Sequence, residues 1–66
     1  MPNAVVIGER LRKLRGDVPR EIVAAECNIS VSALAMYETG NRIPRDEIKV
    51  ALAQYYGISV GDLFFK

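Results

Sequence analysis

The sequence predicts an all-α fold, a small bundle of five helices, and three observations support this. Apolar residues recur at helical spacing along most of the chain. Residues that begin or end helices, among them three prolines and five glycines, divide the chain into short segments. No alternating strand pattern appears after residue 8. With 66 residues, half of them apolar, we expect one domain over residues 1–66 with a modest core, since a chain of this size buries only about 60% of its unfolded surface.

The first predicted helix ends at Gly16, because glycine is strongly preferred just past a helix C-terminus. Its apolar residues Ile7, Leu11 and Leu14 are spaced i, i+4 and i+7. The pattern becomes helical from residue 8 onward. The preceding segment, residues 1–7, is compatible with a first helical turn and with a short extended arm, and the sequence does not distinguish between them.

The second helix is predicted to run from about Pro19 to Glu26. Proline tolerates the first position of a helix because the N–H it lacks would have no partner there, and Glu21 then complements the helix dipole. Val23 and Cys27 recur at helical spacing. We therefore expect a short helix that buries this stripe.

The third helix is predicted to follow a tight turn over residues 27–30. Asn28 belongs to the few non-glycine residue types that accept a positive φ. Ser30 can cap the helix, because its hydroxyl accepts a hydrogen bond from an exposed backbone N–H. Leu34 and Tyr37 are expected to face the core, and Thr-Gly-Asn at residues 39–41 stops the helix.

The fourth helix is predicted to begin at Pro44 and to end at Gly57. The last helix is predicted to begin at Ser59. The apolar residues expected to face the core or a partner in these two helices are Ile48, Leu52, Tyr56, Val60, Leu63, Phe64 and Phe65.

Composition excludes several classes of function. The chain has no histidine and a single cysteine, Cys27, so it lacks the residues for an internal disulfide, a zinc site with the usual ligands, or His-dependent catalysis. We therefore expect no enzyme activity, no cofactor and no metal, and we interpret Cys27 as a small buried hydrophobe. No apolar run approaches the ~20 residues of a membrane span, and no secretory signal pattern opens the chain. A cytoplasmic protein without a membrane partner is expected.

The charged residues are nearly balanced but unevenly distributed. Nine Lys/Arg and eight Asp/Glu give a net charge of +1, unlike the strongly basic balance typical of nucleic-acid-binding domains. Two basic groups nevertheless occur, which predicts local patches and no global field. The first contains Arg10, Arg12, Lys13, Arg15 and Arg20, and the second contains Arg42, Arg45 and Lys49. We interpret Arg10, Arg12 and Lys13 as a solvated helix face.

The second and third predicted helices have the organisation of a helix-turn-helix over about residues 19–38. Ala24 suits this motif, because two helices that cross steeply need a small side chain where they touch. Leu34 would hold the third helix on the second. Spacing alone leaves this assignment open, since any small helical bundle contains such pairs.

The chain resembles the Cro/CI-type (XRE-like) phage-repressor domain, which has the lambda-repressor-like DNA-binding fold. The resemblance extends over nearly the whole chain and rests on IGERLRKLR (7–15), VAAECNISVSALAMYETGNRIP (23–44) and YYGISVGDLF (55–64). In that family the third helix, here about residues 31–38, is the recognition helix in the major groove, and dimers span two half-sites of an operator. The resemblance implies a sequence-specific DNA-binding transcriptional regulator of bacterial or phage origin, a repressor, that binds double-stranded DNA as a homodimer.

The resemblance also assigns roles to individual positions. The residues expected to face base edges are Val31, Ser32, Ala35 and Met36. Those expected to contact phosphates, together with backbone amides of the loop after the third helix, are Arg20, Thr39, Asn41 and Arg42. Arg15 and Glu38 match a structural pair that ties the first helix to the end of the third.

The chain departs from the family pattern at its reading face. The strongest base contacts come from Arg, Lys, Asn and Gln, yet here only Ser32 can hydrogen-bond a base edge. The other three side chains offer apolar contact to thymine methyl groups. The connection between the first two helices is also shorter than usual, and Pro19 replaces the common Ser or Thr cap. We therefore expect modest specificity, or specificity that depends on DNA shape.

An alternative function is a protein-interaction module with the same fold, such as an antitoxin or a small phage factor. The apolar reading face and the low net charge favour it. Separately, Val31 and Met36 have an alternative interpretation as core or dimer residues. For a homodimer, the sequence offers two apolar clusters, residues 4–7 and the C-terminal Val60, Phe64 and Phe65. We favour the C-terminal cluster. The operator, the sign of regulation and any inducer are not given by the sequence.

Overall fold

The computed structural model describes residues 2–66, and over these residues it contains only helices, joined by short turns. In chain order they are α1 (Ala4–Arg15), α2 (Arg20–Glu26), α3 (Val31–Glu38), α4 (Asp46–Tyr56) and the short C-terminal helix η1 (Gly61–Phe65). The predicted all-α bundle of five helices is confirmed. None of the helices in the described part of the chain is long and apolar enough to span a membrane.

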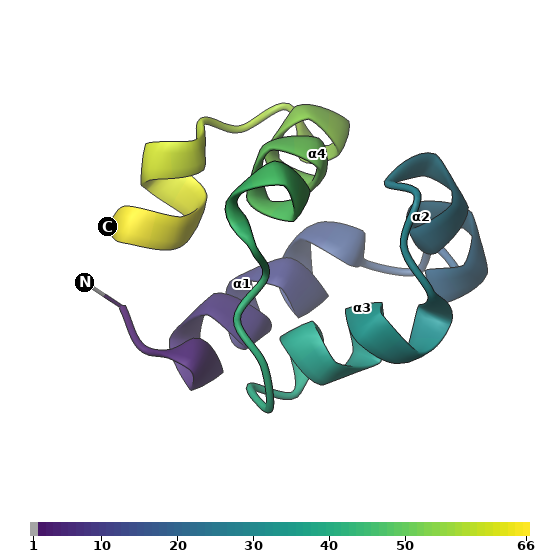
Figure 1. Ribbon diagram of the computed structural model, residues 1–66, viewed down its shortest axis with the longest axis horizontal. Coiled ribbons are helices and arrows are strands. Elements are labelled where there is room, and N and C mark those ends of the chain that lie inside the picture. The colour runs from purple at the N-terminus through teal and green to yellow at the C-terminus, as the bar shows by residue number, and fades with distance from the viewer. Residues whose placement is uncertain (1) are drawn as a thin grey trace.

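Helix α1 contacts both the helix-turn-helix and the C-terminal helix. Figure 1 shows α1 (purple) running along the molecule, with α3 (teal) beside it and α4 (green) on its other side, while both chain ends lie at the same end of the molecule. Helix α1 packs against α3 and η1, and α3 also packs against α2. The helix-turn-helix of α2 and α3 is therefore held by α1, and α3 lies at the edge of the bundle.

Helix α1 begins earlier than residue 8, which answers the question that the sequence left open for residues 4–7. Asn3 caps the helix: its Oδ1 accepts a hydrogen bond from the Val6 N–H at 2.9 Å, and Ala4 is the first helical residue. Gly16 ends α1 with φ 58°, as predicted. Ile7 and Leu11 are buried, but Leu14 is 39% exposed and lies outside the core. Only part of the predicted apolar stripe is therefore used in packing.

Asn28 and Ser30 have their predicted roles in the helix-turn-helix, but α2 begins one residue later than predicted. Pro19 is the N-cap of α2 and not its first residue, because its ψ of 143° is extended. Asn28 has the predicted positive φ, 57°. Ser30 caps α3, since its Oγ accepts a hydrogen bond from the Ala33 N–H at 3.0 Å.

The prediction that α4 starts at Pro44 is wrong by two residues. Arg45 is the N-cap, with an extended ψ of 164°, and α4 begins at Asp46. Pro44 is buried within the extended segment that precedes the helix. The last helix likewise begins at Gly61, and Ser59 stands before it and accepts a hydrogen bond from the Asp62 N–H at 3.0 Å.

One core joins residues from all five helices. Phe64, the largest of its fully buried side chains, closes the core from the C-terminal helix. Cys27 is buried as predicted, and burial raises the pKa of its thiol. The buried apolar residues are Ile7, Leu11, Val23, Ala24, Cys27, Leu34, Tyr37, Leu52, Ala53, Leu63 and Phe64.

Candidate DNA-binding surface

Helix α3 presents a largely apolar face to solvent. Val31 and Ser32, at its start, are exposed, and Ala35 and Met36, one turn later, are half-buried. Spacings of one and four residues place all four on one side of a helix. The opposite side, with Leu34 and Tyr37, is buried in the core. The structure thus gathers the four predicted base-contacting residues on one accessible surface.

The C-terminal end of α3 is fixed by a close approach to α1. A Cβ placed on Gly8 would lie 2.6 Å from the carbonyl oxygen of Glu38 and 2.7 Å from that of Tyr37. Real Cβ atoms do not tolerate such distances from backbone, so only glycine fits here. This contact sets how far α3 stands from the rest of the domain.

A buried ion-pair network secures the same end of α3. The Glu38 side chain is only 1% exposed, and its carboxylate accepts hydrogen bonds from Arg15 Nε at 2.7 Å and Arg15 Nη2 at 3.1 Å. Arg15 Nη1 donates to the carbonyl of Val18 at 2.8 Å. Burial by itself raises the pKa of the Glu38 carboxyl, but the hydrogen bonds from Arg15 and Arg20 outweigh burial and hold this pKa below its usual value. Glu38 is therefore a carboxylate at neutral pH.

Arg20 is the second cationic partner of Glu38. Its Nε donates to Glu38 Oε1 at 2.9 Å, and its side chain remains 36% exposed. The resemblance implied a phosphate contact for Arg20, and this ion pair was missed. Nothing in the spacing of residues 20 and 38 reveals that α2 and α3 bring them together. Arg20 thus lies between the buried network and the surface.

The first three residues of the loop after α3 use their backbone amides internally. The N–H groups of Thr39, Gly40 and Asn41 donate to the carbonyls of Ala35, Tyr37 and Met36, which end the helix. These three amides are not free for phosphates, contrary to the expectation for this part of the loop. The N–H groups of Arg42 and Ile43 donate no hydrogen bond within residues 2–66 and remain available, together with the loop's side chains.

The side chains of the loop are also partly engaged. The Thr39 hydroxyl lies 2.9 Å from the Ala35 carbonyl oxygen, to which it donates, and accepts a hydrogen bond from Asn41 Nδ2 at 2.9 Å. One N–H of the Asn41 amide remains for another acceptor, since an amide nitrogen carries two. Thr39 thereby holds Asn41 at the surface.

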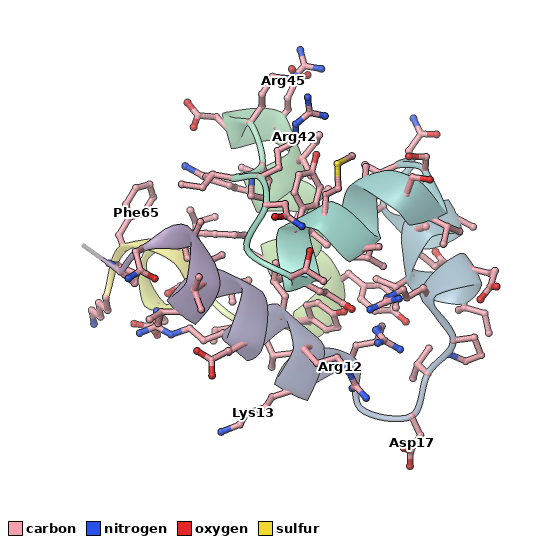
Figure 2. All side chains as sticks on the ribbon, turned by 90° about the horizontal axis from the view of Figure 1, so that it is seen from below. Arg12, Lys13, Asp17, Arg42, Arg45 and Phe65 are labelled. Carbon is pink, nitrogen blue, oxygen red and sulfur yellow. The ribbon has the colours of Figure 1, made fainter. Side chains whose placement is uncertain are left out.

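Arg42 and Arg45 lie near each other in the connection between α3 and α4. They line, with Tyr37 and Ile43, a surface pocket of about 320 Å³. Figure 2 shows both arginines on the same side of the molecule, away from Arg12 and Lys13. Both are exposed, and neither forms an ion pair within residues 2–66. Arg45 was absent from the predicted phosphate contacts, although its place in the second basic group was a signal for it.

The remaining basic residues have other roles. Arg10 Nη1 donates to the carbonyls of Asp62 and Leu63 at 3.3 and 3.2 Å, which ties α1 to η1, so Arg10 is not simply a solvated residue. Lys49 Nζ lies 3.7 Å from Asp46 Oδ1 and 4.9 Å from the centroid of the Phe65 ring. Of the second basic group, only Arg42 and Arg45 remain available to an anion.

The chain is similar to known regulators. A family model described as "Helix-turn-helix" (HTH_3) matches residues 9–63. The solved structure of the clp gene regulator ClgR from C. glutamicum aligns with a TM-score of 0.80 and 26% identity, over 96% of this chain and 86% of that chain. No curated protein sequence matches the chain. Together, the family and this neighbour support a DNA-binding transcriptional regulator. Because the family model spans most of the chain, the protein belongs to the XRE-type helix-turn-helix family.

Proposed function

We propose that this protein is a sequence-specific transcriptional regulator, a repressor of bacterial or phage origin, that inserts α3 into the major groove of operator DNA. The observation that carries the proposal is the accessible face of α3 with cationic side chains at its C-terminal end. Phosphate contacts position a protein on DNA, and base contacts give it specificity. The proposed function acts by occupying DNA and requires no chemistry.

The proposed base contacts are Val31, Ser32, Ala35 and Met36. Ser32 is the one hydrogen-bonding side chain among them, and the other three would contact thymine methyl groups. A face of this kind lacks the bidentate contacts that discriminate bases most strongly. We therefore propose that sequence-dependent DNA shape supplies a large part of the specificity.

The proposed phosphate contacts are Arg20, Asn41 and Arg42, to which the structure adds Arg45 as a candidate. Thr39, predicted as a direct contact, would act by holding the Asn41 amide, because its own hydroxyl donates to the end of α3. Cations that neutralise phosphates release counterions, which makes binding weaken as salt rises.

We further propose that the regulator is a homodimer that uses its C-terminal end. Phe64 cannot take part, because it is fully buried in the core of the single chain. Phe65 is 43% exposed and carries the proposal instead, with Val60 beside the core. Of the alternative N-terminal residues, Val5 is 57% exposed but also packs against Gly40. Two copies on a pseudo-palindrome would place their recognition helices about 34 Å apart.

The test is a binding titration of the whole chain against genomic DNA fragments at two salt concentrations. We expect a subset of fragments to bind more tightly than random DNA, by about 10³-fold or more for a specific regulator. Ser32→Glu should abolish this binding, because Ser32 is exposed on the reading face of α3. Gln54→Glu makes the same charge change at an exposed position of α4 and should leave binding intact.

The protein-interaction module remains a second candidate, favoured by the exposure of Val31, 41%, on a face with few polar groups. In that case Ser32→Glu and Gln54→Glu would bind DNA equally weakly, and no fragment would be preferred. Sedimentation of the chain with and without DNA separates the two candidates further. A monomer under both conditions would count against the repressor.

A further inference from the structure

The buried carboxylate of Glu38 binds two arginines in different ways. Arg15 uses Nε, Nη1 and Nη2 for hydrogen bonds inside the protein. Arg20 uses only Nε, at 2.9 Å from Glu38 Oε1, and neither of its Nη groups makes a hydrogen bond within residues 2–66. Glu38 therefore fixes one edge of the Arg20 guanidinium and leaves its two outer nitrogens unengaged.

This arrangement restricts a side chain that is otherwise very flexible. A guanidinium is planar, so a hydrogen bond at Nε leaves its Nη groups as a fork that can bind a phosphate through two parallel hydrogen bonds. The Arg20 side chain is 36% exposed, whereas that of Glu38 is 1% exposed, so the anchoring carboxylate lies inside the protein and solvent reaches part of the Arg20 side chain. The anchor itself stays in place because Arg15 and the close packing of Gly8 hold the end of α3.

We propose that Glu38 is a positioning residue for phosphate binding by Arg20, in addition to joining α1 to α3. This inference rests on the proposed DNA-binding function. By direct electrostatics the Glu38 carboxylate repels phosphates and should weaken DNA binding. The proposal says the opposite: through Arg20, Glu38 strengthens DNA binding. That difference in sign makes the inference testable.

The experiment compares the affinity for one DNA fragment of the unaltered chain and of Glu38→Gln, Arg20→Ala, Arg20→Lys and the double variant Glu38→Gln/Arg20→Ala. Thermal unfolding followed by circular dichroism gives the folded fraction of each variant at the assay temperature, and affinities refer to that fraction. We expect Glu38→Gln to weaken binding by about two- to tenfold, in the range of couplings within one ion-pair network. In the Arg20→Ala background the same substitution should no longer weaken binding, because only the direct repulsion between Glu38 and the phosphates is then removed.

Arg20→Lys tests the fork without touching Glu38. Lysine keeps the charge but offers a single ammonium group, so it cannot bind both Glu38 and a phosphate in the same geometry. We expect Arg20→Lys to bind DNA more weakly than the unaltered chain with an unchanged dependence on salt. This variant keeps the inference falsifiable if Glu38→Gln does not fold.

Three results would overturn the inference while leaving the proposed function standing. The first is a Glu38→Gln variant that binds DNA as tightly as the unaltered chain or more tightly, which is the result expected if Glu38 acts only by repelling phosphates. The second is an equal loss of affinity with Arg20 present and absent, as a purely structural role demands. The third is normal binding by Arg20→Lys. Failure of the unaltered chain to bind any DNA fragment would instead overturn the proposed function, and this inference with it.

Discussion

The backbone of Gly8 in α1 lies directly against the backbone of Glu38 in α3, with room for a hydrogen atom between them but not for a methyl group. This contact sets the distance between α1 and α3, the proposed recognition helix. It also makes the position of α3 sensitive to a change far from the proposed reading face.

We expect Gly8→Ala to destabilise the fold, because its Cβ would meet the Glu38 carbonyl oxygen at 2.6 Å. Overpacking costs about 1–3 kcal/mol, which exceeds the roughly 1 kcal/mol that alanine gains over glycine within a helix. Urea melts would measure the loss. The matched control is Gly61→Ala, where a Cβ would meet only Ser59 Oγ, at an ordinary contact distance of 3.9 Å. Equal stability of the two variants would contradict this account.

We expect Arg15 and Glu38 to be coupled in stability. A double-mutant cycle with Arg15→Ala and Glu38→Gln should give a coupling free energy of about 0.5–3 kcal/mol, since the pair is shielded from water. The exposed pair of Lys66 and Asp62 serves as the control, and its coupling should be at most about 1 kcal/mol. A coupling free energy of zero for Arg15 and Glu38 would show that this pair does not stabilise the fold.

Tyr56 should make the fold sensitive to alkaline pH. Its buried Oη has no hydrogen-bond partner within residues 2–66, and burial, together with the nearby charge of Glu38, raises the pKa of its phenol to about 12. In an unfolded chain a tyrosine titrates near ~10. The folded state therefore holds the proton more tightly, and this contribution to stability is complete below pH ~10 and is lost as the pH rises through the folded pKa.

The measurement is the free energy of unfolding at several pH values from 9 to about 12. We expect Tyr56→Phe to show a flatter dependence than the unaltered chain in this window. Tyr55→Phe, at a neighbouring position that is 38% exposed, should retain the original dependence. Parallel curves for Tyr56→Phe and the unaltered chain would rule out Tyr56 as the source.

We expect Arg42 and Arg45 to contribute separately to the dependence of DNA binding on salt. Each phosphate neutralised changes the slope of log K against log salt by about 0.9, so Arg42→Ala should flatten it by about 2 per dimer. The affinity should fall on all sequences alike. Arg45→Ala should do the same if both arginines of the shared pocket face DNA, and Arg12→Ala is the control on the other side of the molecule. An unchanged slope would remove the residue concerned from the interface.

Phe65 should be required for self-association. Sedimentation at micromolar concentration should show Phe65→Ser shifted toward the monomer, because its ring, 43% exposed, would lose its burial in the dimer. Ile22→Ser is the comparison, since Ile22 is 51% exposed on α2. If only Ile22→Ser dissociated the dimer, the interface would have to be sought on α2.

The sequence predicted most of the fold because its helix ends have local chemical causes. Ser30, Asn28 and Gly16 act within a few residues of themselves, and each has the conformation or hydrogen bond expected of it. Pro44 misled the prediction because proline is compatible both with a first helical position and with the extended segment before a helix. Spacing could not distinguish the two.

Contacts between distant parts of the chain were harder to predict. The position of Arg20 at the start of α2 suggested a surface contact, yet its bond to Glu38 joins residues 18 positions apart. Leu14 fits the apolar spacing of α1 but is exposed, because the core ends at Leu11 on that side. The Arg20–Glu38 ion pair and the exposure of Leu14 both depend on how the helices cross. The periodicity of residues within one helix carries no information about that crossing.

The network around Glu38 has a consequence for the entropy of recognition. It joins α1, α2 and the last residue of α3, so we expect that end of α3 to open only when the whole domain unfolds. Amide hydrogens of its last turn should exchange with solvent as slowly as those of the core, while the first turn, held by Ser30, frays sooner. A helix that is already ordered before it meets DNA loses little conformational freedom on binding. The proposed reading face has few hydrogen-bonding groups, so its contacts with DNA are weak. Because little entropy is lost in ordering α3, these weak contacts can contribute to affinity almost in full.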